Sequence, residues 1–316
     1  MSDISISWRI FIVALLAAFV PLMVPAYLSF QLTQMIGLAL ALLGLNVLVG
    51  WAGQISLGQG AFFAMGAYGI AMLTDRGMPW WLALALGTVG CAVLGYLFGK
   101  PALRLERAYL ALATFSLALA VPQLLRYRRW EAYTGGAQGL PVQRPEPPTW
   151  LAVTADAYMY WIALAVAALM FIGTQRLRSG STGLECQALR DHEVAAASCG
   201  VDVAAAKTKA FVLSAACAGI GGGLYALNVQ LVTPDSFTLF LSLTLLIGLV
   251  VGGLGSLLGP LLGAAFIQFV PSAAEKISTS APWAIFGLAV LLVVFVAPHG
   301  LAGLPRQLGM RKKKEH

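Results

Sequence analysis

The sequence is poor in charged residues, and this absence already excludes most classes of soluble protein. Only 10% of its 316 residues are charged, whereas a soluble domain carries about 25%. Hydrophobic residues make up 59% of the chain, and the mean hydropathy is +0.82. The net charge of +7 is concentrated in short connectors and in the tail Arg311–Lys314. This pattern indicates a polytopic membrane protein that contacts membrane lipid and does not bind nucleic acid.

The groupings of residues that catalysis, metal binding or nucleotide binding need are also missing. No G-x-x-x-x-G-K-[ST] loop occurs, and in the nearest match, Gly95–Lys100, the glycines are one residue too close. The three histidines are scattered, and the four cysteines show no C-x-x-C spacing, so the cysteines are predicted to be small core residues. We therefore expect no enzyme activity, no metal and no cofactor in this chain.

Hydropathy predicts an all-α transmembrane bundle of about ten spans, forming a single domain over residues 1–316. The twenty residues of Trp80–Gly99 would extend about 30 Å as a helix, which matches a hydrocarbon core. The predicted spans are Ile10–Phe30, Leu32–Val49, Ile55–Leu73, Trp80–Gly99, Ala108–Leu125, Tyr158–Leu177, Ala210–Val229, Phe237–Leu254, Leu257–Pro271 and Pro282–Ala297.

An even number of spans places both termini on the same side of the membrane. The basic connectors Lys100–Arg107 and Arg178–Lys209 fall on that side too, so the positive-inside rule predicts cytoplasmic termini. The connector 126–157 then forms an external loop. It contains four arginines that run against the rule: Arg126, Arg128, Arg129 and Arg144.

The segment Gly44–Leu73 is long and apolar enough to cross a membrane, but glycines and amides interrupt it. Each glycine weakens a helix by about 1 kcal/mol relative to alanine, and an unpaired amide in hydrocarbon costs several kcal/mol. The pattern predicts a broken or re-entrant helix beside a polar route. The alternative is a tightly packed helix pair joined by polar side chains. The candidate translocation-path residues are Asn46, Trp51, Gln54, Ser56 and Gln59.

Glycines recur near the other end of the chain. Five glycines with steps of four, three, four and four predict a small-residue stripe on one helix face: Gly248, Gly252, Gly255, Gly259 and Gly263. Pro260 and the pair Gly252–Gly253 predict a break in that helix, and VGGLGSLLG faintly resembles VGWAGQISLG, which suggests an internal repeat. Elsewhere, GIGGG at 219–223 predicts close helix packing. Asp235 is interpreted as a helix N-cap, with a substrate contact as the alternative.

The connector Arg178–Lys209 is the longest polar excursion toward the predicted cytoplasmic side. Thr182 and Glu185 have the spacing of a capping box, which predicts a helix over Leu184–Cys199. Gly200 fits a left-handed helix end, and Asp202 can cap the helix that follows. This helix–turn–helix is either a solvated amphipathic connector or a docking surface for a partner.

Several stretches resemble a known family. Within Glu193–Gly219, the residues Glu193, Ala195, Ala196 and Gly200 match the Glu-Ala-Ala plus glycine loop of the membrane subunits of ABC importers. The stretch Gly44–Tyr68 resembles the leading signature of branched-chain amino acid permease subunits of the LivM type. Two later stretches resemble further blocks of the same subunits, in the same order: Thr134–Leu140 and Pro234–Ala264. Ala137–Gln138 departs from the commoner Ser/Ala-Asn form, which leaves the substrate open.

This resemblance implies a permease subunit of an importer in the bacterial cytoplasmic (inner) membrane, working by alternating access. The implied partners are a related permease subunit, giving a heterodimer, two cytoplasmic ABC ATPases that bind ATP and Mg, and a periplasmic or lipid-anchored substrate-binding protein. The implied ATPase-coupling residues are Glu185, Arg190, Glu193, Ala195, Ala196 and Gly200.

The expected substrate is a branched-chain amino acid or a similar small solute, although similar permeases carry urea, amides or aromatic acids. An ion-coupled secondary transporter is the main alternative. It would require a paired intramembrane acid or base, which the predicted spans almost lack. A membrane-embedded scaffold or enzyme is a third class, and it is disfavoured because no catalytic cluster is found.

Overall fold

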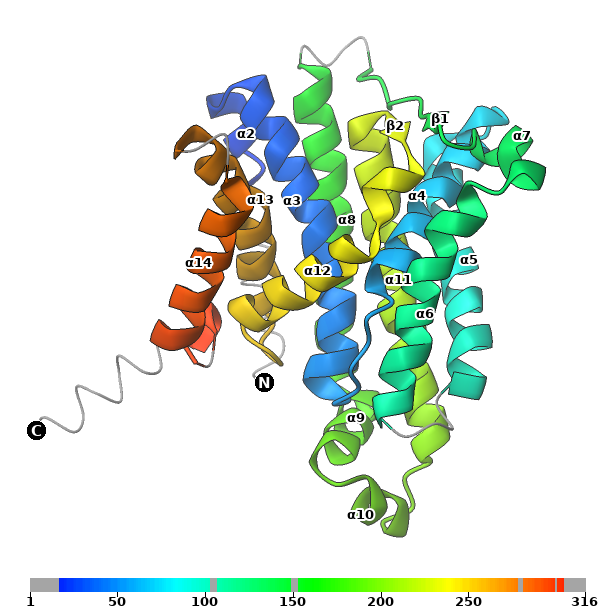
Figure 1. Cartoon of the computed structure of the whole chain (residues 1–316), viewed down its shortest axis with the longest axis vertical. Helices are drawn as coiled ribbons and strands as arrows, with labels where there is room; N and C mark the ends of the chain where they lie inside the picture. The colour runs from blue at the N-terminus through cyan, green and yellow to red at the C-terminus, as the bar shows by residue number, and fades with distance from the viewer. Residues whose placement is uncertain (1–16, 103–106, 149–152, 278–280, 299, 304–316) are drawn as a thin grey trace, which may run out of the picture.

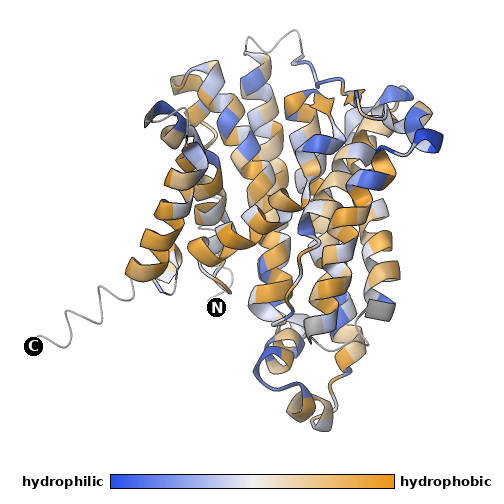
Figure 2. Ribbon diagram, viewed as in Figure 1, coloured by the Kyte–Doolittle hydropathy of each residue, from blue (hydrophilic) through white to orange (hydrophobic). Residues whose placement is uncertain are grey.

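The computed structural model describes residues 17–102, 107–148, 153–277, 281–298 and 300–303, which form a bundle of helices (Figure 1). Apolar residues dominate the middle of the bundle, and hydrophilic residues gather toward its two ends (Figure 2). Among the described residues, five helices are long and apolar enough to cross a membrane, or six if one bent pair counts as a span. The chain is therefore a multi-pass helical membrane protein.

The elements follow one another in this order. The helices are α2 (Val20–Met23), α3 (Ala26–Leu45), α4 (Gln59–Asp75), α5 (Trp80–Ala102), α6 (Arg107–Leu125), α7 (Glu131–Thr134), α8 (Ala155–Ser179), α9 (Ser181–Asp191), α10 (Glu193–Ser198), α11 (Val203–Val229), α12 (Leu239–Gly252), α13 (Gly259–Ile277) and α14 (Pro282–Val296). A π-helix, η1 (Asn46–Trp51), extends α3, and short 3₁₀ turns are η2 (Arg128–Trp130), η3 (Pro234–Phe237) and η4 (Leu301–Gly303). Two short strands, β1 (Leu140–Pro141) and β2 (Leu231–Val232), pair antiparallel.

Helix α11 lies at the centre of the bundle and packs against α3, α4 and α5. In its most apolar stretch 72% of residues are buried, compared with 22% in α5. The contacts are made backbone to backbone, because a Cβ added at Gly222 would lie 1.9 Å from the carbonyl oxygen of Phe63. Gly66 of α4 meets Gly219 in the same way, and Gly221 meets Gly37 of α3. The close packing predicted for GIGGG is confirmed, as expected where helices associate in lipid through small residues.

The start of the bundle differs from the hydropathy prediction. The predicted span Ile10–Phe30 lies partly outside the described residues, and its predicted end is wrong. Val24 is extended (φ −114°, ψ 152°) and precedes Pro25, so α3 begins at Ala26. The residue before a proline is kept out of the helical region by the proline ring, and hydropathy does not register this. The count of ten spans is not confirmed by the five or six spanning candidates among the described residues.

Two further expectations are corrected near the C-terminal half. Pro271 does not end its span, because α13 continues through it to Ile277. Proline is tolerated in membrane helices where neighbours satisfy the freed backbone groups.

Asp235 does not cap α12. It lies in η3 and forms an ion pair with Arg126, which joins the end of α6 to the segment before α12.

The two long connectors lie at opposite ends of the bundle. The helices α9 and α10 project from one end, while α7 and β1 lie at the other (Figure 1). This arrangement places the segments 126–148 and 178–209 on opposite faces of any membrane that the bundle spans.

Replacing Gly222 by leucine should prevent α11 from packing against α4. The new side chain would overlap the backbone of Phe63, and overpacking of this kind costs about 1–3 kcal/mol or more. We expect a clear loss of folded protein in membranes and a lower Tm in detergent. The matched control is Gly173→Leu, because a Cβ at exposed Gly173 has no neighbour within 4 Å. Equal abundance and equal Tm for the two variants would contradict the packing assignment.

Candidate functional site

The first helix break separates α3 from α4. Helix α3 passes into the π-helix Asn46–Trp51, and the chain is not helical again until Gln59. Gly53 has a left-handed conformation (φ 66°), which ends the helix at the position where the sequence predicts a break. π-Helical turns are uncommon and occur frequently at functional sites. The predicted broken segment is therefore present, with Ala52–Gly58 as its irregular part.

The second break separates α12 from α13. Gly253 (φ 115°) and Gly255 (φ 74°) take conformations that favour glycine, and α13 begins at Gly259. The predicted break is confirmed, but the glycine stripe does not lie on one helix. The chain folds back at Gly253, so that a Cβ on Gly252 would lie 2.1 Å from the carbonyl oxygen of Gly259. A Cβ on Gly263 would similarly lie 2.2 Å from the Gly248 carbonyl oxygen.

The two breaks touch each other through Asn46. Its Nδ2 donates to the carbonyl oxygen of Ser256 at 2.8 Å, and its Oδ1 accepts from the Gly255 N–H at 2.8 Å. Asn46 is fully buried, and a Cβ on Gly50 would lie 2.7 Å from the Gly255 nitrogen. Both broken segments thus have a helix–break–helix arrangement. We refer to Asn46, Gly50, Gly53, Gly255 and Ser256 as the break junction.

Arg190 of α9 joins the connector to the break junction. Its Nη1 donates to the carbonyl oxygen of Gly50 at 2.7 Å, and the same atom is 3.3 Å from the Cβ position of Gly255. The stem of Arg190 lies against Gly53, where a Cβ would meet the arginine Cγ at 3.2 Å. One side chain of the connector therefore contacts both helix breaks.

The connector itself is built differently from the prediction. The expected helix Leu184–Cys199 is interrupted at His192, which is extended (φ −159°, ψ 106°) and caps α10 by accepting from the Ala195 N–H. The capping box is also wrong, since Gly180 precedes the first residue of α9 and Glu185 pairs with Lys209 at 3.1 Å. Histidine can act as an N-cap acceptor through Nδ1, and spacing rules for serine and threonine caps do not detect this.

The end of the connector follows the prediction. Gly200 is left-handed (φ 85°), and Asp202 caps α11 by accepting from the Ala205 N–H at 3.0 Å. Glu193 forms an ion pair with Lys207, which ties α10 to α11. Ala196 is buried against the connector core, whereas Ala195 is exposed. Of these two alanines, only Ala195 is therefore available to a partner.

The cysteines divide into two groups. Cys91, Cys186 and Cys217 are buried, as predicted for core residues, but Cys199 at the end of α10 is exposed, so the prediction is wrong for that residue. Burial, with a smaller contribution from the charge of Glu185, raises the pKa of the Cys186 thiol to about 11. Cys199 is thus the accessible thiol of the connector.

Among the predicted path residues, Gln59 and Ser56 are used in packing. Gln59 Nε2 donates to the Ala41 carbonyl oxygen at 2.7 Å, and its Oε1 accepts from the Ser214 hydroxyl at 3.0 Å. Its side chain therefore ties α4 to α3 and α11. Ser56 accepts from the Gly58 N–H at 3.3 Å within the irregular segment. The Gln59 contacts fit the alternative interpretation of polar side chains that join helices, whereas the Ser56 contact is local to the irregular segment.

Gln54 and Trp51 are placed differently. Both are buried, and within the described part of the chain neither polar atom of the Gln54 amide nor the Trp51 indole N–H has a hydrogen-bond partner. The guanidinium of Arg178, at the end of α8, lies 5.5 Å from the Trp51 ring centroid. Sequence reasoning missed Arg178 because it lies far along the chain. A cation–π contact of this kind has no sequence signal except the general pairing of arginine with aromatic residues.

One protein family and several known proteins are similar to this chain. Residues 27–297 match the family described as "Branched-chain amino acid transport system / permease component". The chain is 32% identical to the Escherichia coli high-affinity branched-chain amino acid transport system permease protein LivM, covering 96% of this chain and 76% of that protein. It is 28% identical to the autoinducer 2 import system permease protein LsrC of Enterobacter sp., covering 85% of this chain and 80% of that protein. Among solved structures, it is similar to a metal-chelate type ABC transporter in an inward-facing conformation, with a TM-score of 0.45, 18% identity and coverage of 93% of this chain and 99% of that one.

The family match covers most of the chain, including both helix breaks and the connector. The protein is a transport permease subunit, not an enzyme, and belongs to the family of branched-chain amino acid transport system permease components.

Proposed function

We propose that this chain is the membrane-spanning permease subunit of an ABC importer in the bacterial cytoplasmic membrane, with α9 and α10 facing the cytoplasm. The observation that carries the proposal is the contact of Arg190 with both helix breaks. It offers a direct mechanical route from a cytoplasmic motor to the discontinuous helices. Broken helices in transporters commonly border the substrate path.

The connector has the properties of a surface that receives a partner. Leu184 of α9 and Val194 of α10 are 66% and 74% exposed, although they are apolar. Exposed apolar residues at the aqueous end of a membrane protein are typical of contact sites. We propose that two ATPase subunits, which bind ATP and Mg, dock here, that a related permease subunit completes a heterodimer, and that a periplasmic or lipid-anchored binding protein delivers the substrate.

The proposed substrate is a branched-chain amino acid or a similar small solute. The Escherichia coli relative is named for branched-chain amino acids, whereas the Enterobacter relative is named for autoinducer 2. Members of this group thus differ in substrate at similar sequence distances, so urea, amides and aromatic acids stay as alternatives. An ion-coupled mechanism is less well supported, since the buried Lys207 is already paired with Glu193 at the connector end.

The mechanism we propose is alternating access. Closure of the ATPases would carry α9 with it, and Arg190 would pull on the Gly50 carbonyl and the Gly255 loop together. The two breaks would act as hinges because their glycines tolerate large backbone changes. Trp51, stacked on Arg178, would then narrow or open the route, and the Gln54 amide would bond the passing solute. Asn46, Ser56 and Gln59 would border this route and hold its walls together.

ATP dependence tests the proposed function directly. The complete complex in proteoliposomes should accumulate leucine, isoleucine or valine when ATP and the binding protein are supplied. The uptake should persist when an ionophore removes proton and sodium gradients. Uptake that needs a gradient but no ATP would overturn the proposal in favour of a secondary transporter.

Arg190→Gln should uncouple the ATPases from the helix breaks. A hydrogen bond from a charged group contributes about 1.5–3 kcal/mol, so its loss should lower uptake roughly tenfold or more. The ATPases should still co-purify, because the variant leaves the exposed connector surface unchanged. Uptake at the wild-type rate would contradict the coupling role of Arg190.

A second connector variant gives the contrasting result. Gly200→Val places a β-branched residue at φ 85° and should misorient α10, which lowers ATPase co-purification as well as uptake. Gly200→Asn is its control, because asparagine tolerates left-handed conformations.

Gln54→Leu should raise stability but lower transport. The substitution removes a buried amide that has no partner among the described residues, and such a group costs about 1–3 kcal/mol. The matched control is Gln59→Leu, which should lower Tm because the bonds to Ala41 and Ser214 are lost. Normal uptake by Gln54→Leu would show that Gln54 is not on the path.

A further inference from the structure

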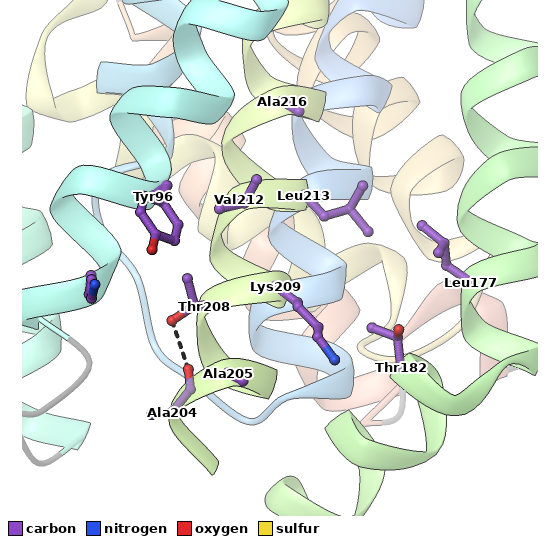
Figure 3. A pocket seen from close by; sticks show the side chains of 11 residues that line it. Tyr96, Leu177, Thr182, Ala204, Ala205, Thr208, Lys209, Val212, Leu213 and Ala216 are labelled. Carbon is purple, nitrogen blue, oxygen red and sulfur yellow. Dashed lines mark hydrogen bonds between the residues drawn. The ribbon is translucent and has the colours of Figure 1, made fainter. Parts of the chain in front are cut away.

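A groove lies apart from the break junction, between α5, α8, α9 and α11 (Figure 3). Its volume is about 680 Å³, within the range of about 300–1,000 Å³ that small-molecule sites occupy. Neither Arg190 nor Gln54 lines it. The proposed transport mechanism therefore leaves this groove without a role.

The groove changes character along its length. Val212, Leu213 and Ala216 of α11 form an apolar wall, as Figure 3 shows. Lys209 and Thr182 lie together at the end nearest the connector. The groove thus suits a ligand with a long apolar part and a polar end.

Its position in the membrane fits the same kind of ligand. The span Trp80–Lys100 is mostly unburied, and Tyr96, Leu97 and Phe98 near its end are 46%, 58% and 45% exposed. Such exposed apolar residues in a spanning helix are available for contact with lipid. Lys100 ends this span, and its Nζ lies 5.7 Å from the Tyr96 ring centroid. A lysine at a helix end places its ammonium at the level of the lipid headgroups.

The charged side chains at the rim of the groove favour a negatively charged ligand. Lys100 and Lys209 both line the groove. Glu185 offsets one of these charges by pairing with Lys209 at 3.1 Å, so one net positive charge is left. A helix from a second subunit is a poorer occupant, because it would bury Lys100, which forms no ion pair with an acid among the described residues.

We infer that this groove binds one anionic phospholipid. The phosphate lies near Lys100 at the rim, and one acyl chain lies along Val212, Leu213 and Ala216. The apolar wall excludes a free phosphate ion as the natural ligand, since a small anion leaves that wall unfilled. This inference does not depend on which solute the permease carries.

The test uses the assembled, delipidated transporter in detergent, titrated with phosphatidylglycerol or with phosphatidylcholine of the same acyl chains. Retained lipid is counted by native mass spectrometry, and Tm is measured in parallel. An interfacial lysine contributes about 1 kcal/mol toward anionic lipid, so we expect a roughly fivefold preference for phosphatidylglycerol. Lys100→Gln should abolish that preference. The matched control, Lys276→Gln, removes an exposed lysine at the other end of the bundle and should leave it unchanged.

A second variant tests the acyl-chain part. Ala216→Phe should fill the apolar wall and reduce retention of both lipids, while Lys100→Gln affects only the anionic one. Equal retention of the two lipids by the wild type would overturn the inference, as would an unchanged preference in Lys100→Gln. Cross-linking of the groove to a second permease chain would overturn it too, because the groove would then be a subunit interface. If Ala216→Phe fails to fold, the comparison of Lys100→Gln with Lys276→Gln still decides the question.

Discussion

Backbone groups freed by a broken helix must find partners inside the protein when the chain lies in hydrocarbon, and the arrangement around Asn46 depends on this constraint. The Asn46 side chain supplies both a donor and an acceptor, and it uses them on Ser256 and Gly255 of the other break. Each discontinuity therefore stabilises the other. Two segments about 200 residues apart in sequence are held together by one buried amide.

Arg190 extends this arrangement to the aqueous end of the bundle. Because it bonds the Gly50 carbonyl and lies against Gly53 and Gly255, a displacement of α9 acts on both breaks at once. The contact works through a backbone carbonyl, which is accessible only where the regular helix has ended. Gly53 and Gly255 thus have two roles: they allow the backbone to leave the helix, and they let Arg190 approach closely. Gln59 and the glycines of α11 hold the surrounding helices in fixed positions.

Local features were predicted well where the conformational preference of a single residue decides the backbone, as for glycine in a left-handed turn or aspartate at a helix N-cap. The glycines of both breaks, the left-handed Gly200 and the capping Asp202 are found where the sequence places them. Predictions failed where a competing local interaction decided the outcome. Pro25 and Val24 moved the start of α3, His192 divided the connector helix, and Arg126 took Asp235 away from a capping role. Predictions from hydropathy and cap spacing do not take such competing interactions into account.

The sequence by itself determined that the chain is a helical membrane protein, which two segments are broken, and which connector is polar. These properties follow from composition and from conformational limits that act over a few residues. Only the tertiary structure decided that the two breaks meet, that Arg190 contacts both, and that Arg178 stacks on Trp51. It also separated Gln59, whose amide is fully used, from Gln54, whose amide has no partner among the described residues. The reason is physical: a hydrogen bond or a ring contact depends on which helices lie side by side. GIGGG predicts that α11 packs closely, but no local pattern specifies that its partners are α3, α4 and α5.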